Sequence, residues 1–329
     1  MKSFLFFIVF LVSQSSWSQK ITVSGISSGA YMAHQFHIAH SANVSGAALV
    51  AGGPYYCSGG LVWNALKLCM ETQLGLPSVR DSLDAADRMA RLGKIDPVKN
   101  VKNSKVYVLA GTLDEVVDPR IGDVTVAFYK RLGVSDRRII LENKLEIGHA
   151  FPTENYGNDC HSPRRSPFIS NCKRDGAGEI LNHLYGKLKP KTQARDNRLF
   201  SFDQTAYFKW PGSLRLSLHN NGLIYFPSHC SLTGKQKCKI HVAFHGCKQT
   251  QDDIGTTYAT QTGFNHWAEA NNIIILYPQT RRDPMIGNPH GCWDWWGYSS
   301  YEFHTKNGAQ IKIIAQIIDD LMNGELALK

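Results

Sequence analysis

The chain has 329 residues, of which 43% are hydrophobic, so it can bury the core of one large α/β domain or of two smaller domains. Its formal net charge is +9, but the lysines and arginines are spread along the whole sequence. Scattered positive charge is typical of a solvated surface and excludes the basic stripe of a nucleic-acid-binding module, so we expect no nucleic-acid partner.

The N-terminal residues predict an exported protein. Lys2 gives a positive start, residues 4–12 form an unbroken apolar run, and Ser16 and Ser18 are small residues near a cleavage point. The apolar run is too short to span a bilayer as a helix. We therefore expect residues 1–18 to be a signal peptide and residues 19–329 to be a single domain. The mature protein should be secreted, either periplasmic or extracellular, without a membrane anchor.

The first predicted strand, turn and helix carry the signature of a nucleophile. A strand is predicted over residues 21–24 and a helix over 28–40, with Gly25-Ile26-Ser27-Ser28-Gly29 between them. Gly-x-Ser-x-Gly is typical of a sharp turn that exposes a serine at the end of a strand, with glycines where side chains have no room. Ser27 is the predicted nucleophile, and the amide of Ser28 is the first expected oxyanion donor.

Three histidines recur on the same predicted helix at positions 34, 37 and 40. Each step of three residues advances about 300° around the helix, so the first and last histidines diverge by about 120° and cannot all bind one ion. We expect these side chains on a partly exposed helix surface, and we expect no metal site.

The chain then alternates strands and helices up to about residue 188, as a parallel sheet with crossover helices does. Strands are predicted over 46–50, 105–110 and 138–141, and helices over 81–92, 122–132 and 176–185.

A serine nucleophile needs a base that a carboxylate orients, in the chain order serine, acid, histidine. Asp114 lies just beyond the strand over residues 105–110, where an α/β sheet places catalytic groups. Asp118 is a rival acid, although its position beside Pro119 suits the start of a helix. His149, which follows Gly148 in the loop after the next strand, is the predicted base.

The last third of the sequence begins after a polar stretch at residues 187–198 that could be a linker. A hairpin is predicted from residues 214–218 and 223–226 around Asn221-Gly222. Strands over 240–244 and 273–277, a helix around 263–270 and a closing amphipathic helix follow. That last helix places Ile314, Ile317, Ile318 and Leu321 on one face, so it packs onto the rest of the protein.

The second oxyanion donor normally comes from a loop that precedes the nucleophile and often begins His-Gly. No such loop precedes Ser27, but His245-Gly246-Cys247 follows the strand over residues 240–244. We infer that the strands expected first in this architecture come last, as in a circular permutation.

The eight cysteines are an even number in a chain that is expected to be exported, which indicates four disulfides. Short spacings favour Cys57 with Cys69, Cys160 with Cys172 and Cys230 with Cys238, which leaves Cys247 with Cys292, although the sequence does not fix the connectivity. Metal binding is the competing interpretation, but the cysteines are scattered and form no Cys-x-x-Cys pair.

Five blocks together resemble one known family, the circularly permuted polyhydroxybutyrate depolymerases within the α/β-hydrolases. The blocks are residues 25–33, 111–114, 148–153, 245–249 and 288–298, the last reading Asn-Pro-His-Gly-Cys-Trp-Asp-Trp-Trp-Gly-Tyr. The resemblance implies an α/β fold with a mostly parallel central sheet flanked by helices. Residues 20–188 would carry the nucleophile, acid and histidine, and residues 210–329 the oxyanion and aromatic loops.

The resemblance also implies roles for particular residues. It implies a catalytic triad of Ser27, His149 and Asp114, with no metal or organic cofactor. The N–H groups of Ser28 and Cys247 would form the oxyanion hole. The aromatic loop would bind substrate, and its residues expected to do so are Asn288, Trp293 and Trp295, with Asn288 and Trp293 nearest the bound chain.

These features predict a secreted serine esterase, acting as a monomer on poly(3-hydroxybutyrate) or another short-chain polyhydroxyalkanoate. Its partner would be a polyester or oligoester. A carbohydrate esterase that removes acetyl or feruloyl groups would have the same triad and differ only in its pocket. A non-catalytic protein that binds polymer through tryptophans is the alternative from another class.

Overall fold

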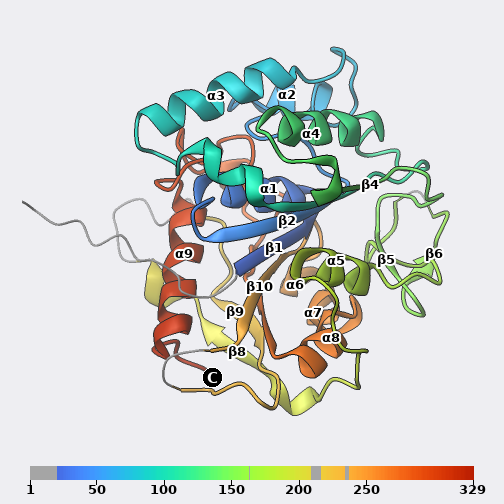
Figure 1. Ribbon diagram of the computed structural model, residues 1–329, viewed down its shortest axis with the longest axis vertical. Coiled ribbons are helices and arrows are strands. Elements are labelled where there is room, and N and C mark those ends of the chain that lie inside the picture. Colours follow the sequence, from blue (N-terminus) through green and yellow to red (C-terminus); the bar gives the residue numbers. More distant parts are fainter. Residues whose placement is uncertain (1–20, 163, 209–215, 234–236) are drawn as a thin grey trace, which may run out of the picture.

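The computed structural model describes residues 21–162, 164–208, 216–233 and 237–329 (Figure 1). The predicted signal peptide lies outside these residues. The central feature is an eight-stranded sheet with the order β4-β3-β2-β1-β10-β11-β9-β8. Its strands are β1 (Ile21–Ile26), β2 (Val44–Val50), β3 (Lys105–Leu109), β4 (Ile139–Glu142), β8 (Leu199–Asp203), β9 (Asn221–Tyr225), β10 (Lys239–Phe244) and β11 (Ile273–Tyr277).

The centre of this sheet joins the two ends of the chain. β1 pairs in parallel with β2 on one side and with β10 on the other, in the register Ile21 to Ile240 and Gly25 to Phe244. The sheet is parallel from β4 to β11, and β9 alone runs in the opposite direction, pairing antiparallel with both β11 and β8. The predicted mostly parallel α/β fold is confirmed, and the strand before the His-Gly loop does lie beside the strand before Ser27. Because β8 and β9 join the same sheet, residues on both sides of the 187–198 stretch contribute to one layer.

Helices cover both faces of the sheet, with α1, α3 and α4 on one side and α5, α7 and α8 on the other (Figure 1). The helices are α1 (Ser28–Ala39), α2 (Val62–Lys67), α3 (Val79–Arg91), α4 (Arg120–Arg131), α5 (Gly176–Tyr185), α6 (Gln251–Ile254), α7 (Thr257–Gln261), α8 (Phe264–Asn271) and α9 (Ala309–Asn323). Successive residues of a strand point to opposite faces of the sheet, so alternate residues pack into two separate cores. Ile21 and Val23 of β1 join the core beneath α1 and α9, whereas Ile26 joins the core beneath α5 and α8.

The predicted partial exposure of His34 and His37 is wrong, whereas His40, which follows the last residue of α1, is partly exposed. Every residue of α1 is buried, and His34 and His37 are 0% exposed, because the helix lies between the sheet and the α3–α4 layer. His37 hydrogen-bonds to the Tyr129 hydroxyl through Nδ1 and to Ser104 Oγ through Nε2, each at 2.9 Å. A helix buried all round has no solvent face for its polar side chains, so each needs a partner inside the protein.

The predicted hairpin around Asn221-Gly222 is also wrong in its described part. These two residues are the first of β9, which pairs with β8 and β11, while Leu218 forms an isolated bridge with Thr280. Residues 214 and 215 of the predicted first arm lie outside the described residues. Gly222 is required by packing, since a Cβ there would come within 2.2 Å of the Phe202 ring.

A second, three-stranded sheet, β5 (Phe151–Thr153), β7 (Ile169–Asn171) and β6 (Asn158–Asp159), lies beside the main one. The three disulfides that short spacing favoured are formed, Cys57–Cys69, Cys160–Cys172 and Cys230–Cys238, and so is the remaining pair, Cys247–Cys292.

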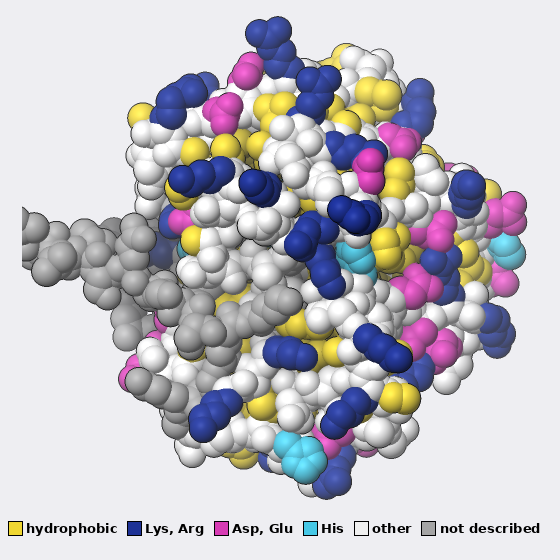
Figure 2. Space-filling view, in the orientation of Figure 1, with side chains coloured by type: hydrophobic (Ala, Val, Ile, Leu, Met, Phe, Trp, Pro, Cys, Tyr) yellow, Lys and Arg dark blue, Asp and Glu magenta, His cyan; other side chains and the backbone are white. Residues whose placement is uncertain are grey.

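Three features of the structure relate to the partners considered in the sequence analysis: the surface charge, the length and hydrophobicity of the helices, and the grouping of metal-binding side chains. On the face in Figure 2, lysines and arginines are distributed among acidic and apolar side chains. Within the described residues, no helix has both the length and the hydrophobicity needed to cross a membrane. In the same ranges, no group of three or more His, Cys, Asp or Glu residues is placed to hold a metal ion.

The buried histidines predict that acid destabilises the fold. Burial lowers the pKa of His34 to about 4, and of His37 and His241 to about 3. In the unfolded chain these groups bind protons near pH 6.5, so stability falls as the pH drops from 6.5 towards 4. Each histidine that stays neutral in the fold costs about 1.4 kcal/mol at pH 5.5. Burial raises the pKa of Asp294, which acts in the opposite direction.

Urea unfolding with intact disulfides, at pH 7.0, 6.0 and 5.0, measures this effect. The free energy of unfolding should fall with pH, and His37→Gln should flatten the fall because the amide does not titrate. The matched control is His161→Gln, since the His161 side chain is 61% exposed and should leave the slope unchanged. A free energy that is constant or rises on acidification would contradict the prediction.

Candidate active site

Ser27 occupies a sharp turn between β1 and α1. Its backbone has φ 57° and ψ −125°, a combination that non-glycine residues rarely adopt, and its N–H donates to the Val50 carbonyl at 2.9 Å. Local strain of this kind persists where the surrounding structure fixes the turn, and such positions cluster at functional sites. The turn places Ser27 at the carboxyl end of the central strand.

The two glycines of the motif are required by close backbone contacts. A Cβ on Gly25 would lie 2.2 Å from the Gly29 carbonyl oxygen. A Cβ on Gly29 would lie 2.3 Å from the Phe244 carbonyl oxygen and 2.4 Å from that of His245. Because neither glycine has a side chain, the first turn of α1 can approach the end of β10, where the His-Gly loop begins.

Asp114 and His149 form a buried hydrogen-bonded pair. Asp114 Oδ2 is 2.8 Å from His149 Nδ1, and the two residues are 7% and 5% exposed. Asp114 Oδ1 accepts the N–H groups of Val116 and Val117, at 2.8 and 2.9 Å. The carboxylate is therefore fixed by its own loop, and it holds the imidazole through Nδ1, leaving Nε2 for a substrate or nucleophile.

The rival acid, Asp118, has other partners. Its carboxylate binds the guanidinium of Arg120 at 2.5 Å and accepts the Thr72 hydroxyl at 2.6 Å. These contacts, led by the hydrogen bond from Arg120, lower the pKa of Asp118 to about 2. Asp118 thus lies just before α4, where its Oδ1 accepts the Arg120 N–H at 2.9 Å, and Asp114 is the acid that contacts the histidine.

A pocket of about 610 Å³ opens over Ser27. Ser27, His149 and Cys247 all line it, so the structure brings together residues from three distant parts of the sequence. The rest of its wall is largely apolar, and includes Val62, Ala65, Leu66, Met70, Val116, Phe168, Pro289, Trp295 and Trp296.

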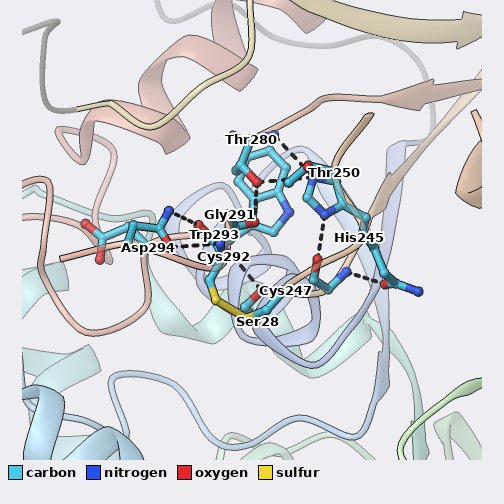
Figure 3. Close-up of a disulfide and its surroundings, with 12 residues drawn as sticks. Ser28, His245, Cys247, Thr250, Thr280, Gly291, Cys292, Trp293 and Asp294 are labelled. Atoms are coloured by element: carbon cyan, nitrogen blue, oxygen red, sulfur yellow. Dashed lines mark hydrogen bonds between the residues drawn. A yellow bond between two sulfur atoms is a disulfide. The ribbon is translucent and has the colours of Figure 1, made fainter. Parts of the chain in front are cut away.

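The His-Gly loop contacts the serine turn directly. A Cβ on Gly246 would lie 3.3 Å from the Cβ of Ser27. The amides on either side of Cys247 are both paired, that of Gly246 with Gln249 Oε1 at 2.6 Å and that of Lys248 with the His290 carbonyl at 2.8 Å. The disulfide joins this loop to the aromatic loop (Figure 3). The Ser28 N–H begins α1, where no carbonyl of the helix can accept from it.

The placement of Trp293 beside a bound chain needs correction. Its ring is 0% exposed, packs against Phe244 and His245, and does not line the pocket. Trp293 therefore belongs to the core. Its backbone N–H donates to Ser28 Oγ at 3.3 Å, which places the residue beside the start of α1 (Figure 3).

The other two predicted residues of the aromatic loop do line the pocket. The Trp295 ring stacks on that of Tyr31 with centroids 4.0 Å apart and an interplanar angle of 10°. The Asn288 side chain accepts the Cys292 N–H at 2.8 Å and donates to the Cys292 carbonyl at 2.9 Å. Asn288 is itself fully buried, so its side chain shapes the loop that carries the disulfide.

Sequence reasoning missed one wall of the pocket. Val62, Leu66 and Met70 come from α2 and the turn after it, and Phe168 comes from the segment just before β7. The signal that could have found the first group is the apolar run at residues 61–70, which the Cys57–Cys69 disulfide closes into a loop. No comparable local pattern marks Phe168.

Comparisons with known proteins agree with this geometry. No family model matches the chain. It is 34% identical over 322 residues to the polyhydroxybutyrate depolymerase of Talaromyces funiculosus, covering 92% of this chain and 90% of that protein. The chain belongs to the polyhydroxybutyrate depolymerase family. It is also 39% identical over 306 residues to the poly(3-hydroxybutyrate) depolymerase of Delftia acidovorans, but spans only 60% of the length of that relative.

Two solved structures of this family are similar to the chain. A PHB depolymerase complexed with R3HB trimer has a TM-score of 0.82 and 31% identity, covering 92% of this chain and 95% of the other. The PHB depolymerase from Penicillium funiculosum has a TM-score of 0.81 and 31% identity, with coverage of 93% and 96%. Both confirm the α/β arrangement over nearly the whole chain.

The close approach of α1 to β10 predicts a large effect of a single methyl group. Gly29→Ala should destabilise the fold by about 3 kcal/mol, since the added carbon overlaps two backbone oxygens that cannot move independently. Gly93→Ala is the matched control, because Gly93 has φ 69° and no atom within 4 Å of an added Cβ. It should cost about 1 kcal/mol, from backbone strain alone. Urea unfolding compares the two, and equal losses would rule out the overlap at Gly29.

Proposed function

We propose that this chain is a serine esterase that hydrolyses poly(3-hydroxybutyrate) or another short-chain polyhydroxyalkanoate. The observation that carries the proposal is that Ser27, His149 and the Cys247 loop open onto one largely apolar pocket, with Asp114 behind the histidine. Two relatives named as depolymerases of this polyester, and a neighbouring structure that holds an R3HB trimer, support the substrate class.

In the proposed mechanism, Ser27 Oγ attacks the carbonyl carbon of an ester unit while His149 Nε2 takes the hydroxyl proton. The oxyanion that forms accepts hydrogen bonds from the Ser28 and Cys247 N–H groups. His149 then gives the proton to the departing alcohol oxygen, which leaves an acyl-serine. Water, deprotonated by the same imidazole, attacks the acyl-serine. The imidazolium then returns the proton to the Ser27 oxygen as the acid departs, which restores both groups. Asp114 stabilises the imidazolium and fixes its orientation throughout.

The pocket suits a polyester chain better than a polysaccharide. Its walls are mostly hydrocarbon, with the Trp295 ring on one side. Besides Ser27 and His149, the charged and polar side chains that line it are those of Arg164, Lys248, Asn288 and His290. Val62 and Leu66 on α2 are 55% and 41% exposed, so the apolar surface continues outside the pocket. An apolar chain with one carbonyl in each repeat matches such a surface. We place the bound chain along Trp295, with Asn288 behind it as the group that shapes the wall.

We further propose that the enzyme acts as a monomer outside the cytoplasm. The four disulfides are typical of an oxidising compartment, and the N-terminal sequence has the pattern of a signal peptide.

Adjacent serines provide the direct test of the proposed nucleophile. Ser27→Ala should abolish labelling by a fluorophosphonate probe and lower hydrolysis by about 10⁴-fold or more. Ser28→Ala should keep the labelling, because Ser28 acts through its backbone N–H, and should lower hydrolysis far less than Ser27→Ala, since only the contact of its hydroxyl with the Trp293 N–H is lost. The assay measures release of 3-hydroxybutyrate from amorphous polymer and film, beside acetate and ferulate release from xylan. Release from xylan alone would indicate a carbohydrate esterase, and no labelling of folded wild-type protein would indicate a binding protein.

The two aspartates provide an independent test of the triad. Asp114→Asn should lower kcat on a soluble p-nitrophenyl ester by about 10³- to 10⁴-fold, since the amide cannot hold the imidazole in the required tautomer. Asp118→Asn should change kcat by less than about threefold and affect mainly the melting temperature, since Asp118 pairs with Arg120. Equal losses of kcat in the two variants would overturn the assignment of Asp114.

A further inference from the structure

The orientation of one peptide bond decides whether the proposed oxyanion hole exists. The carbonyl of Gly246 and the N–H of Cys247 belong to the same planar, trans peptide and point in opposite directions. Whatever holds the Gly246 oxygen away from the pocket therefore turns the Cys247 N–H towards it. A flipped peptide would present a carbonyl oxygen to the oxyanion and repel it.

The His245 side chain holds this carbonyl. His245 Nδ1 lies 2.7 Å from the Gly246 oxygen, and the ring is 0% exposed (Figure 3). Because a carbonyl oxygen can only accept, Nδ1 must carry the proton. On the other side of the ring, the Thr280 N–H donates to Nε2 at 3.2 Å, so Nε2 must be the unprotonated nitrogen. The two contacts together define a single neutral tautomer.

The surroundings of the ring favour the same state. Thr280 Oγ1, 3.3 Å from Nε2, uses its hydrogen to bind the Gly291 carbonyl at 2.5 Å. Burial lowers the pKa of His245 to about 4, so the imidazole is neutral at ordinary pH. The ring also packs beside Trp293, with centroids 5.5 Å apart, which fixes its plane.

We propose that His245 is a positioning residue for the hydrolysis reaction: it orients the Gly246–Cys247 peptide so that the Cys247 N–H faces the oxyanion. This inference rests on the proposed esterase function. Gln249 and the disulfide secure the loop on either side, since Gln249 Oε1 binds the Gly246 N–H and Cys247 is bonded to Cys292. His245 acts on the peptide oxygen itself, through a nitrogen that never touches substrate.

Two substitutions distinguish the contact made by Nδ1 of His245 from the contact made by Nε2. In His245→Asn, the side-chain NH₂ lies where Nδ1 lay and can donate to the Gly246 oxygen. In His245→Gln, the longer side chain reaches the Nε2 position and loses that contact. His241→Asn and His241→Gln are matched controls, because His241 is also 0% exposed and its ring nitrogens bind the side chains of Thr22 and Ser24, at 2.7 and 2.8 Å.

Steady-state kinetics on a soluble ester give the main readout. His245→Gln should lower kcat by about 10²- to 10³-fold with KM changed less than about threefold, as expected when one oxyanion donor is lost. His245→Asn should recover kcat to within about tenfold of wild type. Affinity for a boronic acid, which forms a tetrahedral adduct on serine, should fall in parallel with kcat/KM. The His241 pair should change the melting temperature without this pattern. Equal kcat values in the two His245 variants, or a loss confined to KM, would overturn the proposal.

The wild-type protein gives a test that does not depend on variants folding. Nitrogen NMR of ¹⁵N-histidine protein should show His245, assigned through the proton contact between its ring and the Thr280 amide, with a protonated Nδ1 and a bare Nε2. The opposite tautomer would overturn the inference. Failure of the proposed function is distinguishable, because wild-type protein would then be inactive or Ser27→Ala would retain activity.

Discussion

The parallel ladder between β1 and β10 is the contact on which the rest of the site depends. It aligns Gly25 with Phe244, so the turn that carries Ser27 and the loop that carries Gly246 leave the sheet side by side. Two glycines then let these segments approach closely, at Gly29 against the Phe244 backbone and at Gly246 against the Ile26 carbonyl and the Ser27 Cβ. Strand pairing fixes the position to within a few ångströms, and the absent side chains allow the final approach.

Polar contacts within the loops then hold in place the residues that the pairing of β1 and β10 brings together. The Asp114 carboxylate accepts two backbone N–H groups in addition to its contact with His149. The Asn288 side chain binds both the N–H and the carbonyl of Cys292. Asp294 accepts the N–H groups of Gly297, Tyr298 and Ser299, although burial raises its pKa. Loops secured in this way lose little freedom when a substrate binds, which is the arrangement that electrostatic stabilisation of a transition state requires.

The sequence predicts those parts of the site that leave a local signal. The motif around Ser27, the acid beyond a strand end at Asp114 and the His-Gly pair at 245–246 are each recognisable from a few neighbouring residues, and the structure brings all three together. Trp293, His34 and His37 were misplaced, because their burial depends on helices and loops far away in the chain. The prediction of a hairpin was wrong for a related reason. Asn221-Gly222 has the pattern of a turn, but pairing with β8 and β11 makes these residues the start of strand β9.

The position of Cys247 in the last third of the sequence has a consequence for timing. Synthesis proceeds from the N-terminus, so Ser27, Asp114 and His149 emerge from the ribosome well before residues 247 and 292. A nascent polypeptide therefore contains its nucleophile, acid and base while the strand that completes their sheet, and the sulfur bond that closes the loop, do not yet exist. In the proposed enzyme, hydrolytic competence would be the last property acquired during biogenesis, and a prematurely terminated product would remain inert towards esters.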